Sequence, residues 1–319
     1  MDDLPLLADI RQAAQRIQPH LHQTAVMTNR AINELSAAEC FFKCENFQKV
    51  GAFKARGALN AVLSMAPDKL QRGVATHSSG NHAAALALAA QIAGVPAYVV
   101  MPQNAPAIKQ RAVAAYGARI TLCEPNLQAR EEGLASIVEK TGAAFIPPFD
   151  DYRVICGQAT VTMELLEEIE RLDIILAPVG GGGLLSGTAL STHYLSPTTR
   201  VIAVEPEAAD DAYRSFKAGK LIPVGTAQSI ADGLLTSLCD RTFDIIRQYV
   251  HDIVIVNETA IIDATRLIME RMKIIVEPSA AIVLAAILEN KLDVKGKRVG
   301  LILSGGNLDI DSFSVARPA

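Results

Sequence analysis

The sequence has little that would bind nucleic acid. It contains no tryptophan, and aromatic residues make up only 5% of its 319 residues. Its 34 aspartates and glutamates outnumber its 30 lysines and arginines, which gives a net charge of −4. Nucleic acids and anionic membrane surfaces are bound by basic patches. We therefore expect no nucleic-acid partner.

Long hydrophobic runs are also absent. A membrane-spanning helix needs about 18 to 20 uninterrupted apolar residues, and the nearest candidate, residues 83–100, is interrupted by Gln91 and Pro96. The N-terminal residues MDDLP lack the positive and apolar regions of a signal peptide. We therefore expect a cytoplasmic protein without a membrane partner.

Cysteine is scarce, and its pattern does not match a zinc site. The five cysteines are an odd number, and only Cys40 and Cys44 lie close together, without a second pair of ligands. We interpret all five as reduced thiols.

The sequence does contain a large apolar fraction in an alternating order. Hydrophobic residues make up 50% of the chain, which is enough for one large core or two smaller ones. Short β-rich runs alternate with helical patterns, and this order predicts an α/β fold with parallel strands. The expected strands of the first block are residues 73–76, 97–101, 118–123 and 144–147, and its expected helices are residues 83–93, 106–116 and 127–140.

The same alternation continues in a second block, from an apolar strand at residues 173–179 to a last strand at residues 298–303. We predict two α/β domains with parallel-rich, twisted sheets flanked by helices. Residues 73–148 form the smaller domain, and residues 1–72 together with 149–319 form the larger one.

Four consecutive glycines, residues 180–183, stand between an apolar strand and a helix that starts near Leu184. Glycine lets backbone N–H groups close around an anion, and a helix N-terminus adds positive potential. The junction therefore favours a phosphate site over a simple flexible turn. It is neither a Walker loop nor a Rossmann fingerprint, and the lysine of a P-loop is missing.

Lys54 follows Phe53 in the segment GAFKARG. A lysine of this kind is most often an exposed surface residue. Three further segments change the interpretation: SSGNH at residues 78–82, the glycine run, and SGGN at residues 304–307. Together they provide one amine and three small-residue loops, which suit an aldehyde cofactor that carries a phosphate and a pyridine ring.

With these segments in this order, the chain resembles the fold-type II pyridoxal-phosphate enzymes, which share the fold of the tryptophan synthase β subunit. It is most similar to the branch that contains serine racemases, serine/threonine dehydratases and 3-hydroxyaspartate ammonia-lyases. The resemblance extends from about Gln18 to Asp309. It implies an amino-acid substrate, a homodimer, and pyridoxal 5'-phosphate in the cleft between the two domains. The larger domain would bind this cofactor, and the smaller one would close over the substrate.

The resemblance assigns a role to each cofactor-binding position. Lys54 bonds the cofactor's aldehyde and later acts as a base, and Phe53 lines the ring or belongs to the core. Asn81 faces the phenolic oxygen, and Ser304 faces the pyridine nitrogen. The predicted cofactor-binding residues are Phe53, Lys54, Asn81, Gly180, Gly181, Gly182, Gly183, Leu184 and Ser304.

Substrate binding is assigned to the loop at residues 78–82 and to one arginine. A loop that leads into a helix N-terminus suits a carboxylate, although for His82 itself we favour a capping or core role over direct catalysis. Arg130 matches a substrate-contacting arginine of the racemases, or else it is an exposed helical residue. The predicted substrate-binding residues are Ser78, Ser79, Gly80, Asn81, His82 and Arg130.

An acidic segment, EPEAADD at residues 205–211, follows an expected strand. Carboxylate and carbonyl oxygens suit a hard divalent cation, whereas acidic residues are also common at helix N-termini. The resemblance favours a cation, Mg²⁺, Mn²⁺ or Ca²⁺, held by Glu205, the Ala209 carbonyl and Asp211.

The implied reaction is a β-elimination of a 2-amino-3-hydroxy acid such as L-serine, L-threonine or 3-hydroxyaspartate to a keto acid and ammonia. The alternative is an amino-acid racemase, in which Lys54 and Ser79 act on opposite faces of Cα. Pro147 stands where animal serine racemases have a histidine, which favours the dehydratases. A non-catalytic ligand sensor and a β-replacing sulfhydrylase are two further alternatives.

Overall fold

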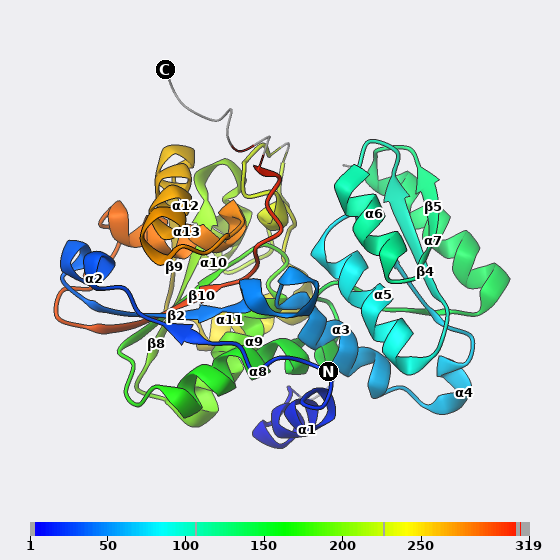
Figure 1. Cartoon of the computed structure of the whole chain (residues 1–319), viewed down its shortest axis with the longest axis horizontal. Coiled ribbons are helices and arrows are strands. Elements are labelled where there is room, and N and C mark those ends of the chain that lie inside the picture. The colour runs from blue at the N-terminus through cyan, green and yellow to red at the C-terminus, as the bar shows by residue number, and fades with distance from the viewer. Residues whose placement is uncertain (1–3, 106, 226, 311–312, 314–319) are drawn as a thin grey trace.

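The computed structural model describes residues 4–105, 107–225, 227–310 and 313. They fold into two layered α/β units that lie side by side, with α3 (Lys54–Leu63) between them (Figure 1). Each unit has its own β-sheet with helices on both faces. The structure thus confirms the predicted α/β fold with parallel-rich sheets flanked by helices.

The larger sheet has six strands in the order β1-β2-β10-β7-β8-β9, and only β1 runs antiparallel to its neighbour. Its strands are β1 (Val26–Met27), β2 (Glu39–Cys44), β10 (Arg298–Leu303), β7 (Ile174–Pro178), β8 (Arg200–Pro206) and β9 (Asp252–Val256). The smaller sheet is fully parallel, in the order β5-β4-β3-β6. Its strands are β5 (Arg119–Cys123), β4 (Ala97–Pro102), β3 (Val74–His77) and β6 (Ala144–Phe145).

Helices cover both faces of the larger sheet, so its strands are apolar on both sides. Along β7, Ile174 belongs to one buried cluster with α12 and α13, whereas the next residue, Ile175, belongs to another with α8, α9 and α11. The helices of this unit are α1 (Leu7–Ile17), α2 (Arg30–Ser36), α8 (Tyr152–Glu168), α9 (Gly183–Leu195), α10 (Asp211–Ala218), α11 (Asp240–Tyr249), α12 (Glu258–Met272) and α13 (Pro278–Leu288).

The smaller unit carries α5 (Asn81–Ala93), α6 (Ala107–Ala115) and α7 (Leu127–Thr141), and the short α4 (Pro67–Leu70) precedes its first strand. Helices α5, α6 and α7 agree with the sequence prediction to within two residues, although Pro106 lies outside the described residues, and α4 was not predicted. Both β3 to β6 and α5 to α7 fall within residues 73–148. The division into two domains at that segment's boundaries stays a prediction.

Several elements were not predicted from the sequence, among them β2 and α1, and two others, β1 and α8, show a physical reason. Strand β1 has two residues, which is too short for any periodic pattern. Helix α8 contains the run Thr160-Val161-Thr162, and β-branched residues lower helix propensity. Helix α8 forms despite these residues because most of its length is buried against α3 and α9, and this packing stabilises it.

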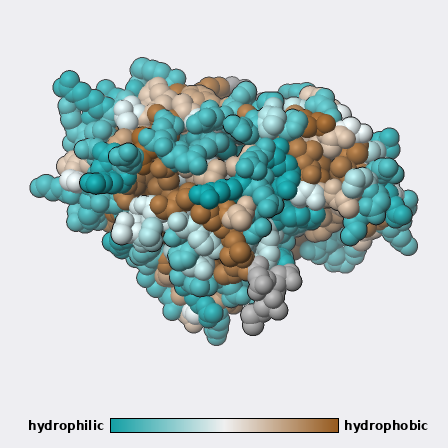
Figure 2. All heavy atoms as spheres, turned by 90° about the horizontal axis from the view of Figure 1, so that it is seen from below, coloured by the Kyte–Doolittle hydropathy of each residue, from teal (hydrophilic) through white to brown (hydrophobic). Residues whose placement is uncertain are grey.

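One face of the molecule is mixed in polarity (Figure 2), and the cysteines are unpaired. On the face shown in Figure 2, hydrophobic residues lie in patches among hydrophilic ones. Within the described part of the chain, no helix is both long enough and apolar enough to span a membrane. All five cysteines are free, as predicted, and Cys40, Cys44 and Cys156 are buried.

Candidate functional site

The site forms where strand ends of the larger sheet meet. Strands β7 and β10 are parallel neighbours, so the glycine loop after β7 and Ser304 after β10 leave the sheet at the same edge. The N–H of Phe53 donates to the Ser304 carbonyl at 3.0 Å. Ala52 also pairs with Gly305 in an isolated bridge. These contacts place Lys54, the first residue of α3, beside the loop that contains Ser304.

Lys54 has the environment of a reactive amine. Its side chain is half-buried, and Nζ donates to the carbonyl of Pro148 at 2.8 Å. Burial lowers the pKa of Lys54 to about 8, although the Glu277 carboxylate acts in the opposite direction. Nζ also lies 5.1 Å from the centre of the Phe53 ring. The amine therefore reaches its neutral, nucleophilic form closer to neutral pH than an exposed lysine does.

The glycine loop offers free donors. No described residue accepts a hydrogen bond from the N–H groups of Gly180, Gly181 or Gly182. Helix α9 begins at Gly183, so the first N–H groups of the helix also lack intrahelical partners. Unpaired donors and the positive end of a helix dipole together suit a phosphate.

Packing provides an independent reason for these glycines. A Cβ atom on Gly181 would lie 2.2 Å from Cε1 of Phe149, and one on Gly183 would lie 2.9 Å from Cβ of Phe149. Gly182 has a φ of +86°, which L side chains rarely adopt. The loop is therefore held in shape by Phe149, a residue that sequence reasoning did not assign to the site.

The segment at residues 78–82 joins β3 to α5, as predicted. The N–H of Gly80 donates to Oγ of Ser78 at 3.4 Å, and no described residue is hydrogen-bonded to the hydroxyl of Ser79. His82 is buried, and its Nε2 lies 2.9 Å from the carbonyl of Ile146. Burial and the charge of Lys54 lower the pKa of His82 to about 3. This environment suits a neutral core histidine.

Arg130 lies on the first turns of α7 and is half-exposed. Its Nε donates to the carbonyl of Asn126 at 3.4 Å, which is a weak contact. Burial lowers the pKa of His77, and the charge of Arg130 lowers it further. Because His77 ends β3, Arg130 lies near the strand that leads directly into the Ser78–Gly80 loop.

Glu277 is a site residue that the sequence analysis missed. It is 6% exposed, and both of its carboxylate oxygens accept hydrogen bonds from Nδ2 of Asn81, at 3.0 and 3.1 Å. Burial raises the pKa of Glu277 to about 7. The available signal was a single carboxylate within the apolar segment IIVEP at residues 274–278.

A cavity of about 650 Å³ opens between the two units, beside this contact. Gly80 and Asn81 line it from the smaller unit, and Glu277 and Asn307 line it from the larger one. Lys54 does not line this cavity. Asn81 and Glu277 are therefore shared between the cavity and the surroundings of the amine.

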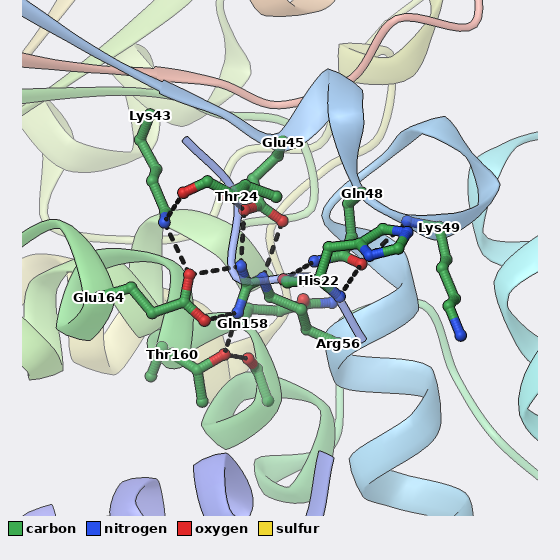
Figure 3. A network of polar contacts seen from close by, with 12 residues as sticks. His22, Thr24, Lys43, Glu45, Gln48, Lys49, Arg56, Gln158, Thr160 and Glu164 are labelled. Carbon is green, nitrogen blue, oxygen red and sulfur yellow. Dashed lines mark hydrogen bonds and ion pairs between the residues drawn. The ribbon is translucent and has the colours of Figure 1, made fainter. Parts of the chain in front are cut away.

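A buried ionic network anchors the helix that carries Lys54. Figure 3 shows the side chains of Glu45, Glu164 and Thr160 directed at the guanidinium of Arg56. Arg56 is 1% exposed and donates twice to Glu45, at 2.8 Å each, and twice to Glu164, at 2.6 and 2.8 Å. Lys43 donates to Glu164 at 2.6 Å. The network fixes α3 two residues after its lysine.

The predicted cation ligands lie at the N-terminus of α10. Glu205, at the end of β8, accepts the N–H groups of Ala212 and Tyr213 at 2.9 and 2.8 Å. Asp211 is 1% exposed, and neither of its carboxylate oxygens has a hydrogen-bond partner among the described residues. Burial raises the pKa of Glu205 to about 8 and also raises the pKa of Asp211. No group of three or more His, Cys, Asp or Glu residues suited to a metal occurs in the described ranges.

Comparison with known proteins identifies the family. A sequence model of the family described as "Pyridoxal-phosphate dependent enzyme" matches residues 17–305. The chain belongs to the pyridoxal-phosphate dependent enzymes. The resemblance inferred from the sequence is therefore confirmed, as is the prediction of an enzyme that uses pyridoxal phosphate.

Relatives of this enzyme cover nearly its whole length. A beta-hydroxyaspartate dehydratase of Paracoccus denitrificans is 49% identical over 97% of this chain and 98% of its own. A serine racemase of Dictyostelium discoideum is 47% identical over 97% of this chain and 96% of its own. The structure of maize serine racemase superposes with a TM-score of 0.95 at 42% identity, covering 98% of this chain and 96% of the maize chain.

The residues of this pyridoxal-phosphate dependent enzyme fit the cofactor. The unpaired N–H groups of the glycine loop and the start of α9 suit its phosphate, and the half-buried amine of Lys54 suits its aldehyde. Ser304, which is 3% exposed and directly follows β10, would offer a neutral hydroxyl to a ring nitrogen. Gly305 and Gly306 follow it, and their missing side chains leave room for the Glu277 carboxylate and the Ile275 carbonyl.

Proposed function

We propose that this enzyme is an ammonia-lyase that converts a 2-amino-3-hydroxy acid to a keto acid and ammonia, and that 3-hydroxyaspartate is its best substrate. The observation that carries the proposal is the amine of Lys54, half-buried beside Ser304 with a pKa of about 8. L-Serine and L-threonine are the alternative substrates. The dehydratase relative of Paracoccus denitrificans supports the choice of 3-hydroxyaspartate.

The chemistry divides between cofactor and protein. Bound pyridoxal phosphate withdraws electrons from the substrate and makes the Cα proton acidic. Lys54 takes that proton as the general base. The β-hydroxyl takes up a proton and leaves as water, and hydrolysis of the remaining unsaturated amine releases ammonia and the keto acid. For 3-hydroxyaspartate the keto acid is oxaloacetate.

Two positions bind the substrate in this proposal. The Ser78–Gly80 loop precedes the N-terminus of α5, where backbone N–H groups and the helix dipole favour the α-carboxylate. Arg130, near the start of that loop, pairs with the second carboxylate of 3-hydroxyaspartate. L-Serine and L-threonine lack this group, so Arg130 would separate the dicarboxylic substrate from them.

Racemisation is the second candidate function, and Ser79 is the observation that favours it. Its hydroxyl has no hydrogen-bond partner among the described residues and stands in the substrate loop. A proton removed by Lys54 on one face and returned by Ser79 on the other would invert Cα. The serine racemase of Dictyostelium discoideum supports this candidate.

We further propose that a divalent cation binds between Glu205, the Ala209 carbonyl and Asp211. Both carboxylates are buried, neither Asp211 oxygen has a hydrogen-bond partner among the described residues, and burial and the charge of Asp211 raise the pKa of Glu205, so a cation would compensate a costly arrangement. Oxygen ligands of this kind suit Mg²⁺, Mn²⁺ or Ca²⁺. The cation would stabilise the turn before α10, away from Lys54.

The test is one assay with two readouts. Purified enzyme with pyridoxal phosphate and Mg²⁺ is supplied with L-serine, D-serine, L-threonine and each isomer of 3-hydroxyaspartate, and keto acid and the opposite enantiomer are quantified together. We expect keto acid to dominate, with 3-hydroxyaspartate giving the highest kcat/KM. Lys54→Ala should abolish both products, whereas Lys69→Ala, on the exposed α4, should leave them unchanged.

Other outcomes would decide against the proposal. Enantiomer formed faster than keto acid would make the enzyme a racemase. L-Serine or L-threonine turned over faster than every 3-hydroxyaspartate isomer would refute the substrate assignment. Neither product, from an enzyme with the cofactor bound, would refute both candidate functions.

A further inference from the structure

Glu277 is connected to three parts of the site at once. It precedes α13, and its N–H donates to the carbonyl of Gly305 at 3.0 Å, next to Ser304. A Cβ atom on Gly305 would lie 2.7 Å from Oε1 of Glu277, so the carboxylate packs directly against that loop. Its charge also acts on the amine of Lys54. The proposed mechanism gives this buried acid no task.

The side-chain amides of Asn307 and Asn81 determine the direction of the hydrogen bonds that reach Glu277. Nδ2 of Asn307 donates to the carbonyl of Val50 and to Oδ1 of Asn81, both at 2.8 Å. The Val50 carbonyl can only accept, so the nitrogen of Asn307 must face it, and the oxygen of Asn81 must face Asn307. The amide nitrogen of Asn81 is then left to donate to Glu277. The network is thus built to receive an ionised carboxylate at position 277.

The charged groups around Glu277 come from three other elements. Lys54 belongs to α3, Lys109 to α6, and Asp232 to the 3-10 turn η4 (Asp232–Leu234). Lys109 and Asp232 form an ion pair with each other at 2.5 Å, so their effects on Glu277 oppose each other. Among the described residues, no arginine or lysine forms a salt bridge with Glu277. Lys109 is therefore already paired, whereas burial lowers the pKa of Lys54 and the Glu277 carboxylate acts to raise it. Lys54 directly follows the Ala52–Phe53 segment that contacts Ser304 and Gly305.

We propose that Glu277 is a positioning residue of this enzyme: its carboxylate, held by Asn81, is the counter-charge that keeps a proton on the nitrogen of Lys54. The inference rests on the proposed function for its purpose, since that nitrogen must hold and release a proton during elimination. The effect of the Glu277 charge on that proton is already present in the holoenzyme without substrate. We therefore expect an effect in the absence of any substrate.

The experiment is a pH titration of the absorption spectrum of the holoenzyme without substrate, which reports protonation of the nitrogen that bonds the cofactor. The Glu277→Gln variant keeps an oxygen that accepts from Asn81 but removes the charge. We expect the midpoint of the titration to move to lower pH by about one unit, a tenfold loss of proton affinity. Glu277→Asp, which keeps the charge, should stay closer to the wild-type midpoint than Glu277→Gln.

The matched control is Glu289→Gln at the opposite end of α13, where Glu289 accepts from Asn257. It should leave the midpoint unchanged. If Glu277→Gln does not retain the cofactor, Asn81→Ser carries the test. Removing the Asn81 amide nitrogen, which donates to both oxygens of Glu277, makes Glu277 harder to ionise, so the midpoint should again move to lower pH. An unchanged or higher midpoint in the variant that retains the cofactor would overturn the proposal.

The spectroscopic result is separate from the reaction assigned to the enzyme. A shifted midpoint in an enzyme that makes no keto acid would refute the proposed function alone. An unchanged midpoint in an active ammonia-lyase would refute the role of Glu277 alone.

Discussion

Replacing Arg56 by methionine should lower the free energy of unfolding by about 3 to 5 kcal/mol. Arg56 is 1% exposed and makes four hydrogen bonds to two carboxylates, Glu45 and Glu164. Methionine fills a similar volume, so little of the loss would come from a cavity. The loss comes from the carboxylate that remains.

After Arg56 is replaced, the two carboxylates differ in the partners that remain to them. Glu164 retains Lys43 at 2.6 Å and is partly exposed. Glu45 is 0% exposed and would retain only the hydroxyl of Thr24. Removing one partner of a buried ion pair leaves an uncompensated charge, and that charge is on Glu45. The double variant Glu45→Gln with Arg56→Met should therefore be more stable than Arg56→Met by at least about 1 kcal/mol.

Urea unfolding of the holoenzyme, followed by circular dichroism, measures these differences. The control is Arg30→Met, because the side chain of Arg30 is 91% exposed and forms an ion pair of similar length, 2.7 Å, with Glu34. We expect little change from it, since exposed pairs contribute little. The reasoning is refuted if Arg56→Met costs no more than Arg30→Met, or if the double variant recovers nothing.

Three further predictions concern single sites. Ser79→Ala should leave keto-acid formation within a few fold and reduce any enantiomer formation about 100-fold or more, and an equal loss of both products would contradict its assignment as the second acid/base group. Gly157→Ala should cost about 1 to 3 kcal/mol in urea unfolding, because its Cβ would lie 2.5 Å from main-chain oxygen of α3, whereas Gly225→Ala, in open space, should cost little. Mg²⁺ added after EDTA treatment should raise the Tm of the wild type but not of Asp211→Asn, and an equal rise in both would exclude Asp211 as a ligand.

Local signals explain what was predictable. Four glycines between an apolar strand and a helix indicate a loop with unusual backbone geometry, and Gly182 has a positive φ there. The parallel strands were predictable because helices on both sheet faces require apolar residues at successive positions, as Ile174 and Ile175 show. The serine and lysine positions came from the order of these motifs along the chain.

Contacts between distant segments explain what was not. Phe149 shapes the glycine loop by touching Gly181, yet nothing in its own neighbourhood indicates that contact. His82 stood beside the substrate loop in the sequence, but the fold turns its ring toward the Ile146 carbonyl in the core. A side chain's direction depends on the packing of its whole element.

The sequence by itself determined the α/β alternation, the loops that suit a phosphate and a carboxylate, and the lysine that precedes them in the chain, because backbone conformation and apolar periodicity are local properties. Only the tertiary structure decided the electrostatics of that lysine. Asn81 and Glu277 are 196 residues apart in the chain, and Arg56 and Glu164 are 108 apart. The protonation of a carboxylate depends on its burial and its partners, and both are set only when the distant segments pack together.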